Sequence, residues 1–388
     1  MYDNVLILSI AIILISIVPA SGLAATPQKP VLVIGATGKV GRLAVQALSK
    51  SGVPTRAMCR DVDRGREVLH DYMKETPDLI TLVKGDVTDP ETLKEAIMGT
   101  QAVLALHGTL HPAPIHKLLI PIFWATHSPL KLGAASTHPY FTNYVAMQDI
   151  LTLCEKYEVG KIVRLTGLSC AFPPYNPVSV LFNALLSFSG RYHRMGEEVL
   201  QSSSKVQVRK GREERSDVSM GPPRVYSNTN PDARRFAPPV LRSSRPKSFI
   251  LRPGGLSDEP RDSTKTTVQL DFRGNLPPPA RVGRGDVANA AVLSVIDERL
   301  SNSGHIVAAI RWAGEVAPKS QGNLGDGGIT VNDALGMALD KGGGCNEKRW
   351  AGNSFAIFHG LYVYAFTAVA IKITWGFAKF ALRLVVKG

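Results

Sequence analysis

Cysteine is scarce in this sequence and is never clustered. Only four occur among 388 residues, at Cys59, Cys154, Cys170 and Cys345. None forms a C-x-x-C pair, and no group of histidines and cysteines has the spacing of a zinc site. The sequence therefore predicts no metal and no disulfide framework, and a single disulfide bridge is the alternative.

The excess of basic over acidic residues is confined to two segments of the chain. The formal net charge is +13, and residues 201–250 hold 11 Lys or Arg against 4 Asp or Glu, while residues 341–388 hold 7 against 1. The remainder of the chain is therefore about neutral, which disfavours nucleic acid as a partner.

Residues 202–248 contain almost no apolar periodicity and are rich in Arg, Ser and Pro. A segment of this composition cannot bury enough apolar surface to fold alone. We interpret it as a disordered basic insertion. A basic recruitment loop and a retained intron in the gene model are the alternatives.

Long apolar runs are confined to the two ends of the chain. Residues 5–18 form a 14-residue run that is too short for a comfortable membrane span, and small residues follow it up to Ala24. Residues 1–24 are typical of a secretory signal peptide. Such peptides usually begin with basic residues, whereas here Asp3 precedes the run and no Lys or Arg does. An uncleaved anchor or a buried helix is the alternative. We expect the secretory pathway, or the plastid if the source is an alga with complex plastids.

The C-terminal run, residues 354–371, has 18 residues without a formal charge. Four basic residues follow at spacings of 7, 4 and 4, which place them on one face of a helix: Lys372, Lys379, Arg383 and Lys387. We expect residues 354–388 to form a transmembrane or membrane-surface helix, joined by a linker over residues 341–353. A helix packed on the protein's own core is the alternative.

The stretch PVLVIGATGKVGRLAVQALSKSG, which begins at Pro30, is the most informative in the chain. Residues 31–34 predict a buried strand, and glycines at 35, 38 and 41 precede apolar residues with helical period. In this strand, turn and helix, Gly35 permits the tight turn and Gly38 lets a pyrophosphate approach. Gly41 allows close packing of helix on strand, and the helix N-terminus offers its amides to phosphate.

Two side chains at the ends of the next strands indicate which nucleotide is bound. Arg60 ends the second predicted strand, where an arginine can pair with a 2′-phosphate, so NADP(H) is favoured over NAD(H). An ion pair with Asp61 is the alternative. Asp86 follows the third strand and can accept from the adenine amino group, while Asp89 caps the helix from Pro90. The predicted cofactor-binding residues are Gly35, Thr37, Gly38, Val40, Gly41, Arg60, Asp86 and Val87.

Several motifs together resemble the atypical short-chain dehydrogenase/reductase family, in its NmrA-like NAD(P)H-binding branch. They are GATGKVG, Arg60, GDVTD, KIVRLTGLS and FILRPGGLSDEP, and the resemblance covers about 30–200 and 247–340. It implies an α/β fold over residues 30–340, with a Rossmann doubly wound parallel sheet and a small C-terminal substrate-side portion. The cofactor is expected at the carboxyl ends of the strands.

One residue that this resemblance leads us to expect is absent. In catalytic members of the wider superfamily, a tyrosine transfers a proton, and a lysine four residues later lowers the tyrosine pKa. A serine or threonine at the end of the fifth strand orients the substrate carbonyl. Tyr192 is present here, but Gly196 stands at the lysine position. The predicted catalytic residues are Thr166, Tyr192 and His193, the last because histidine titrates near neutral pH.

Two functions therefore remain open at the level of sequence. The first is an oxidoreductase that transfers a hydride to or from an unidentified carbonyl or activated double bond. The second is a non-catalytic NADP(H)-binding scaffold or redox sensor at a membrane. Lys161 and Arg164, on the fifth strand, are expected at the surface or in ion pairs. Nothing in the sequence names the small-molecule substrate.

Overall fold

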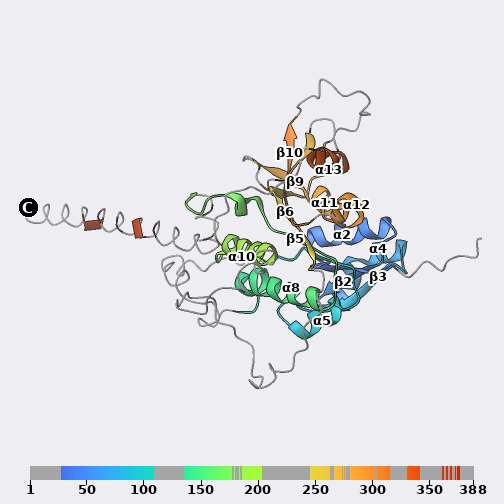
Figure 1. Cartoon of the computed structure of the whole chain (residues 1–388). Helices are drawn as coiled ribbons and strands as arrows, with labels where there is room; N and C mark the ends of the chain where they lie inside the picture. The colour runs from blue at the N-terminus through green and yellow to red at the C-terminus, as the bar shows by residue number, and fades with distance from the viewer. Residues whose placement is uncertain are drawn as a thin grey trace, which may run out of the picture.

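A twisted sheet of eight strands, most of them parallel, organises the part of the chain that the structure describes (Figure 1). The computed structural model describes residues 28–108, 135–176, 186–202, 245–262, 266–272, 280–301, 304–314 and 330–340, with single residues between and after them. The strand order is β3-β2-β1-β4-β5-β6-β10-β8. Neighbouring strands are parallel except β10 and β8, which are antiparallel. The predicted Rossmann-like parallel sheet is confirmed.

The strands alternate with helices along most of the chain. The strands of the sheet are β1 (Val31–Ile34), β2 (Thr55–Cys59), β3 (Ile80–Lys84), β4 (Ala102–Ala105), β5 (Lys161–Leu165), β6 (Lys247–Pro253), β8 (Thr266–Asp271) and β10 (Ile306–Gly314). The helices are α2 (Lys39–Lys50), α3 (Val62–Val68), α4 (His70–Glu75), α5 (Pro90–Ile97), the π-helix η1 (Tyr140–Val145), α8 (Ala146–Lys156), the 3₁₀-helix η2 (Leu168–Ala171), α10 (Ser189–Ser202), α11 (Arg284–Ile296), α12 (Glu298–Ser301) and α13 (Val331–Asp340).

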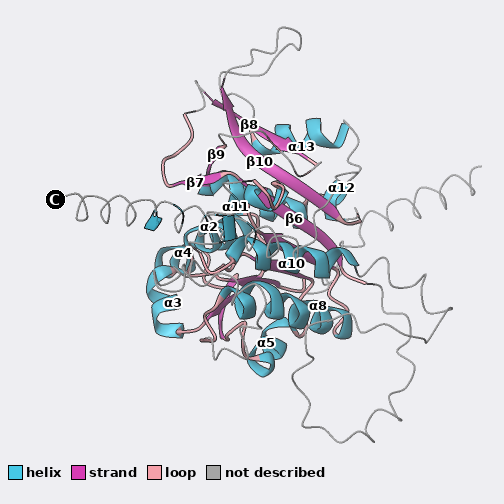
Figure 2. Cartoon of the chain, turned by 90° about the vertical axis from the view of Figure 1, so that its left-hand side faces the viewer, coloured by secondary structure: helices cyan, strands magenta, loops and turns pink. Residues whose placement is uncertain are grey.

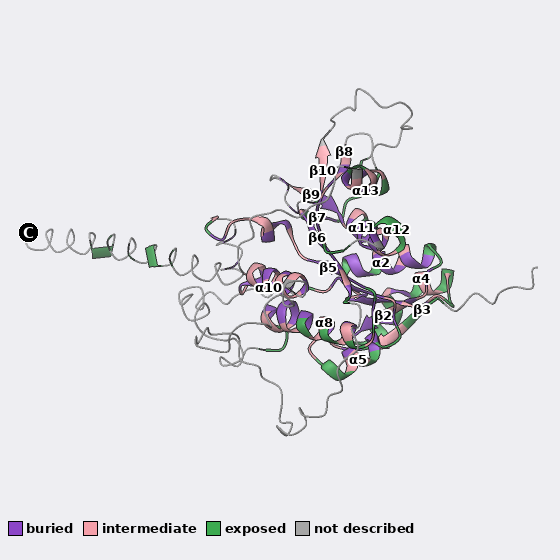
Figure 3. Ribbon diagram, in the orientation of Figure 1, coloured by how far each residue is buried: buried purple, intermediate pink, exposed green. Residues whose placement is uncertain are grey.

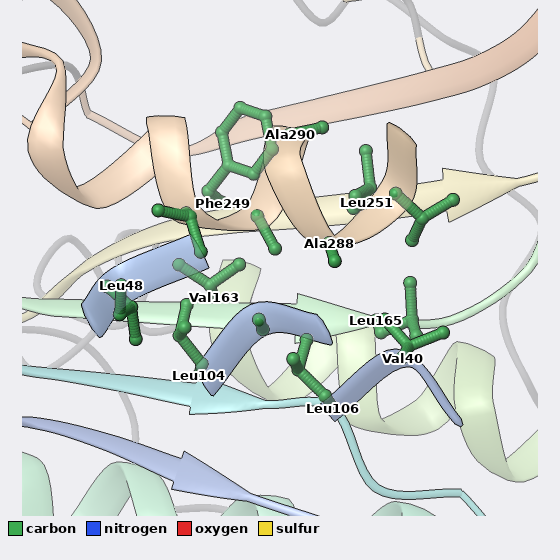
Figure 4. Packing of buried hydrophobic residues seen from close by; sticks show 14 of the residues in the cluster. Val40, Leu48, Leu104, Leu106, Val163, Leu165, Phe249, Leu251, Ala288 and Ala290 are labelled. Atoms are coloured by element: carbon green, nitrogen blue, oxygen red, sulfur yellow. The ribbon is translucent and has the colours of Figure 1, made fainter. Parts of the chain in front are cut away.

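Helices cover both faces of this sheet, and successive strand residues point to alternate faces. One core cluster joins strand residues such as Val31 and Val33 to α2 and α11. Figure 4 labels Val163 and Phe249 among its strand residues and Ala288 on α11. The other cluster joins the alternate strand residues, such as Leu32, to α5, α8 and α10. The two helical layers are visible from the side in Figure 2, and Figure 3 shows the buried strands between them. Each fully buried aliphatic side chain contributes about 1.5–3 kcal/mol.

The parallel register brings the carboxyl ends of four central strands to one edge. Ile34 pairs with Met58 on one side and with Ala105 on the other, and Ala105 pairs in turn with Arg164. The loops that leave β1, β2, β4 and β5 therefore emerge side by side, where ligands bind in folds of this kind.

The last part of the described chain adds a small layer beside β6. A second, two-stranded parallel sheet pairs β7 (Gly255–Ser257) with β9 (Arg281–Gly283). The antiparallel strand β8 closes the edge of the main sheet, and α13 packs on β8 and α11. This portion corresponds in sequence to the predicted small C-terminal unit.

Several predictions concern segments outside the described residues. They are the signal peptide over 1–24, the linker over 341–353 and most of the insertion; of residues 354–388 only single positions are described. The insertion is shorter than predicted, because Ser202 ends α10 and Lys247 begins β6. No helix in the described part of the chain combines the length and apolarity that crossing a membrane requires. The predicted C-terminal membrane helix is therefore not confirmed.

Candidate functional site

The glycine-rich turn between β1 and α2 has the geometry that the sequence predicts. Gly35 has φ of +83°, which an L-residue rarely adopts, and Gly38 donates its amide hydrogen to the Gly35 carbonyl oxygen at 2.9 Å. A Cβ atom on Gly41 would lie 2.0 Å from that same oxygen. Glycine at 41 thus permits the first turn of α2 to contact the strand end, and the free amides of α2 face the turn.

A cavity of about 230 Å³ lies at the carboxyl edge of the sheet above this turn. Six of the eight predicted cofactor residues line it: Gly35, Thr37, Gly38, Arg60, Asp86 and Val87. Val40 and Gly41 are not among the lining residues. Val40 instead belongs to the core between α2 and the sheet (Figure 4), and Gly41 serves the helix–turn contact.

The end of the cavity beside β2 and β3 presents one cation and one carboxylate. Arg60 is exposed and, within the described residues, no carboxylate oxygen lies within 4.0 Å of it. Asp61 does not pair with it but caps α3 by accepting from the amides of Asp63 and Arg64. Asp86 accepts from the Thr88 amide and hydroxyl through Oδ1, both at 2.8 Å, which leaves Oδ2 for another donor. Asp89 caps α5, as predicted.

Other residues line the cavity without having been predicted. Along β2 and β3 they are Met58, Cys59, Gly85 and Thr88, and at the end of β4 and before η1 they are Leu106, His107, Ser136, Thr137 and Thr142. Their position in the sequence could have identified most of them, because they lie at or directly after the carboxyl end of a parallel strand. Gly108, where the sequence predicts close approach of the nicotinamide ribose, also lines the cavity. The three described cysteines are free thiols, and burial raises the pKa of Cys59 to about 11, so this thiol stays protonated at neutral pH.

Helix α10 presents two different faces to its surroundings. Tyr192 and Gly196, four residues apart, face η1 and α8, where a Cβ atom on Gly196 would lie 2.3 Å from the Asn143 carbonyl oxygen. His193 and Glu197, also one turn apart, face the ends of β5 and β6. The tyrosine–lysine spacing that the resemblance implies therefore falls on the face that packs on a neighbouring helix.

Tyr192 lies in an aromatic cluster and not on the cavity wall. Its ring packs edge-on against Tyr140 at 5.5 Å and against His138 at 5.8 Å, and it is 2% exposed. Burial raises the pKa of Tyr192 to about 12. This environment does not favour the predicted role in proton transfer, because the phenol has neither access to the cavity nor a lowered pKa.

Glu197 is the centre of a buried ionic network, and the Thr166 hydroxyl also donates to it. The carboxylate accepts from Arg252 at 2.7 and 3.1 Å, from Arg194 at 3.1 Å and from the Thr166 hydroxyl at 2.7 Å. The two arginines lower the pKa of Glu197 to about 2 despite its burial. Thr166 therefore orients Glu197 in this structure, and it is not among the residues that line the cavity.

Arg164 forms a second polar cluster at the end of β5. Its guanidinium donates to the carbonyl oxygens of Ala105 at 3.3 Å and His107 at 2.9 Å, to Asn143 Oδ1 at 3.4 Å and to His193 Nδ1 at 3.3 Å. The prediction that Arg164 lies at the surface or in an ion pair is wrong, because it is fully buried and its acceptors are neutral. Lys161 is also buried, with its ammonium on the Leu300 carbonyl.

Burial and the nearby Arg164 charge keep both histidines of this cluster neutral. The pKa of His193 falls to about 3, and that of His107 falls well below its usual range. The expectation that His193 titrates near neutral pH is therefore wrong. At pH 7 its ring can still donate one hydrogen bond, but it is not a proton donor of suitable acidity.

The residues at the strand ends fit a nicotinamide dinucleotide. The positive φ of Gly35 and the close contacts at Gly35 and Gly41 keep the turn free of side chains where a pyrophosphate would approach the α2 amides. Arg60 and Asp86 lie at one end of the cavity and His107 and Gly108 at the other, which suits an extended ligand.

Comparison with known proteins agrees with this geometry. Residues 35–207 match the family model described as NAD(P)H-binding. The isoflavone reductase homolog IRL of Zea mays is 32% identical over 96 residues, 24% of this chain and 31% of the relative. The phenylcoumaran benzylic ether reductase TP7 of Nicotiana tabacum is 33% identical over 96 residues, with the same two coverages of 24% and 31%. The match therefore spans about a third of the length of these curated relatives.

Among solved structures, a wide-type short-chain dehydrogenase/reductase from Veillonella parvula, in complex with NADP, aligns with 73% of this chain and 94% of its own. The two are 14% identical, with a TM-score of 0.45. The glycine turn, the strand-end cavity and the match over residues 35–207 lead to one conclusion: the chain carries an NAD(P)H-binding domain.

Proposed function

We propose that the protein is an NADP(H)-dependent oxidoreductase that transfers a hydride between nicotinamide and a carbonyl or activated double bond of a small molecule. The observation that carries the choice of NADP(H) is Arg60. Its exposed guanidinium lies on the cavity wall with no carboxylate within 4.0 Å among the described residues. A planar guanidinium binds phosphate oxygens in pairs, so this position suits a ribose 2′-phosphate.

The chain's own residues have distinct tasks in this proposal. The turn from Gly35 to Gly38 and the first amides of α2 bind the pyrophosphate, and Asp86 Oδ2 accepts from the adenine amino group. Gly108, at the end of β4, leaves room for the nicotinamide ribose. When bound, the nicotinamide supplies or accepts the hydride. The reductase names of the two plant relatives support this reaction class.

A non-catalytic NADP(H)-binding scaffold or redox sensor is the second candidate. The burial, the pKa values and the hydrogen bonds of the predicted catalytic residues favour this function. Tyr192 is buried with a raised pKa, His193 stays neutral, and the Thr166 hydroxyl donates to Glu197. Neither Tyr192 nor His193 therefore has a pKa suited to proton transfer at pH 7, and the Thr166 hydroxyl is already engaged. A reaction by this chain would then take its proton from water or from the substrate.

The cofactor proposal is tested by titrating the full-length protein with NADPH and NADH in a calorimeter. Arg60→Ala should weaken NADPH binding by roughly tenfold or more, since hydrogen bonds to charged groups are worth about 1.5–3 kcal/mol. NADH binding should change little. Arg66→Ala is the matched control, because Arg66 is an exposed cation of the same region that does not line the cavity.

Equal losses in the two variants would show a general charge effect and would remove the assignment of Arg60. If neither nucleotide binds the wild-type protein, both candidate functions fail. If NADPH binds, its consumption is then measured against α,β-unsaturated carbonyl compounds and benzylic ethers. Consumption of NADPH with any of them favours the oxidoreductase, and tight binding without consumption across the panel favours the sensor.

We also propose that residues 354–388 associate with a membrane, and that residues 1–24 direct the protein to the secretory pathway or a plastid. The support is the sequence alone, namely the uncharged run and the four basic residues that follow it on one helical face. Flotation with vesicles containing anionic lipid tests the first part. A chain ending at residue 350 should stay unbound while the full chain floats, and equal behaviour would contradict the proposal.

A further inference from the structure

Arg164 is a buried cation without an anionic partner. It is 0% exposed, and among the described residues no carboxylate oxygen lies within 4.0 Å of it. Its Nε–H is buried and has no hydrogen-bond partner in that part of the chain. Burying an ion costs several kcal/mol, and buried ions are normally paired with an opposite charge.

The neighbouring ionic network does not supply the missing charge. Glu197 is the one buried carboxylate among the residues that the structure describes, and it already faces two buried guanidinium groups, those of Arg194 and Arg252. The half-exposed Glu198 reaches Arg194 at 3.9 Å. Both carboxylates therefore already face guanidinium groups other than that of Arg164.

The hydrogen bonds of Arg164 also fix the orientation of its neighbours. A guanidinium can only donate, so Asn143 presents Oδ1 to it at 3.4 Å, and the Nδ1 atom of neutral His193 lies 3.3 Å from the same guanidinium. The amide nitrogen of Asn143 lies 3.3 Å from His193 Nε2. A neutral imidazole carries its one hydrogen on Nδ1 or on Nε2, so in either tautomer one ring N–H points at a neighbouring donor. Two donor groups thus face one another with no acceptor between them. The amide has a second contact, to Ser189 Oγ at 3.4 Å.

This pair of donors lies beside the cavity. Gly108 lines the cavity, and a Cβ atom on Gly108 would lie 3.7 Å from His193 Cε1 and 3.9 Å from Nε2. Asn143 and Arg164 are fully buried, whereas His193 is only partly buried. A ligand would therefore reach the cluster through His193, at the end of the cavity opposite Arg60.

We propose that this cluster binds a carboxylate of the substrate, so that the protein acts on small organic acids. The proposal deepens the oxidoreductase function proposed above and rests on it. One carboxylate oxygen accepts from His193, in the tautomer with its hydrogen on Nε2, and the Arg164 charge behind this ring provides the electrostatic attraction. Arg164 is then a specificity-determining residue, and an uncharged analogue of the substrate binds more weakly.

The test compares acetate with acetamide, which share shape and a single methyl group but differ in charge. Both are titrated against the full-length protein saturated with NADP⁺, at constant ionic strength, and binding is followed by saturation-transfer NMR of the methyl signal. Acetate should bind at least roughly tenfold more tightly than acetamide, because one charge-assisted hydrogen bond has about this effect. Equal binding, or no binding of acetate, would overturn the proposal.

Two variants locate the effect in the cluster. Arg164→Met and His193→Leu should each weaken acetate binding by roughly tenfold or more and leave acetamide nearly unchanged. Arg66→Met is the control for loss of an exposed positive charge and should leave both titrations unchanged. Acetate binding that survives both cluster variants would contradict the assignment.

If Arg164→Met does not fold, the wild-type comparison and His193→Leu decide the question. NADPH titration of the same samples separates this proposal from the cofactor proposal. A protein that binds NADPH but does not discriminate acetate from acetamide retains its proposed function and loses only the carboxylate site.

Discussion

A Cβ atom placed on Gly196 would lie 2.3 Å from the carbonyl oxygen of Asn143. Helix α10 therefore crosses η1 so closely that only glycine fits at this position. The same atom would also lie 3.2 Å from Met147 Cγ on α8. The residue that replaces the expected lysine is thus explained by helix packing, and a lysine side chain there would have no path to the cavity.

Gly196→Ala should lower the free energy of unfolding by about 1–3 kcal/mol, because the added methyl group overpacks the contact with Asn143. Urea unfolding followed by circular dichroism measures the change. Gly285→Ala is the matched control, since no atom lies within 4 Å of its added Cβ in α11. That variant should be neutral or more stable by up to about 1 kcal/mol. Similar losses in both variants would contradict the packing explanation.

Gly35→Ala should abolish NADPH binding as well as lower stability. Its φ of +83° strains an L-residue, and the added Cβ would lie 3.0 Å from the His107 amide nitrogen at the cavity wall. Gly52→Ala separates the two effects, because Gly52 has φ of +71° with nothing within 4 Å. We expect about 1–2 kcal/mol of destabilisation from strain alone in Gly52→Ala, with NADPH affinity unchanged. Intact NADPH binding in Gly35→Ala would remove the turn from the cofactor site.

Glu197→Gln should destabilise the protein by about 3–5 kcal/mol, because two buried guanidinium groups lose their shared negative partner. Glu91→Gln is the control. Glu91 pairs with Lys94 at the surface, and breaking such a pair costs about 0–1 kcal/mol. Chemical unfolding at neutral pH measures both, and a loss in Glu197→Gln no larger than the control's would contradict the importance of the network.

Glu197 should also make the stability depend on pH in the acid range. Its pKa in the folded protein is about 2, below the ordinary value of 4.5. The stabilisation is therefore complete above pH 4.5 and is lost as the pH falls toward 2. The slope of unfolding free energy against pH in this window should be smaller in Glu197→Gln than in wild type. Identical slopes would show that this carboxylate is not held by the arginines.

The first strand, the nucleotide turn and the helix after it could be predicted from the sequence because local patterns determine them. A short apolar run, glycines at 35, 38 and 41, and an amphipathic helix follow one another without long-range information. Arg60 and Asp86 could be assigned for the same reason, since each follows directly on a predicted strand and both line the cavity.

The substrate side could not be predicted, because it depends on contacts between distant segments. Whether His193 or Tyr192 faces the sheet depends on how α10 packs on η1, which no spacing in α10 reveals. A stronger inference was available for Arg164. The strand KIVRL lies in a parallel sheet covered on both faces, so an arginine within it is expected to be buried.

The ion pair between Glu197 and Arg252 joins two elements that are 55 residues apart in the chain. Glu197 lies in α10, before residues 203–244, and Arg252 lies in β6, after them. Strands β5 and β6 also pair with one another. The positions of α10 and β6 are therefore fixed by these contacts and do not depend on residues 203–244, which connect them. Each doubling in the length of such a connection costs only about 0.6 kcal/mol of closure entropy. Evolution can therefore lengthen, shorten or rewrite residues 203–244 while the nucleotide-binding domain keeps its fold.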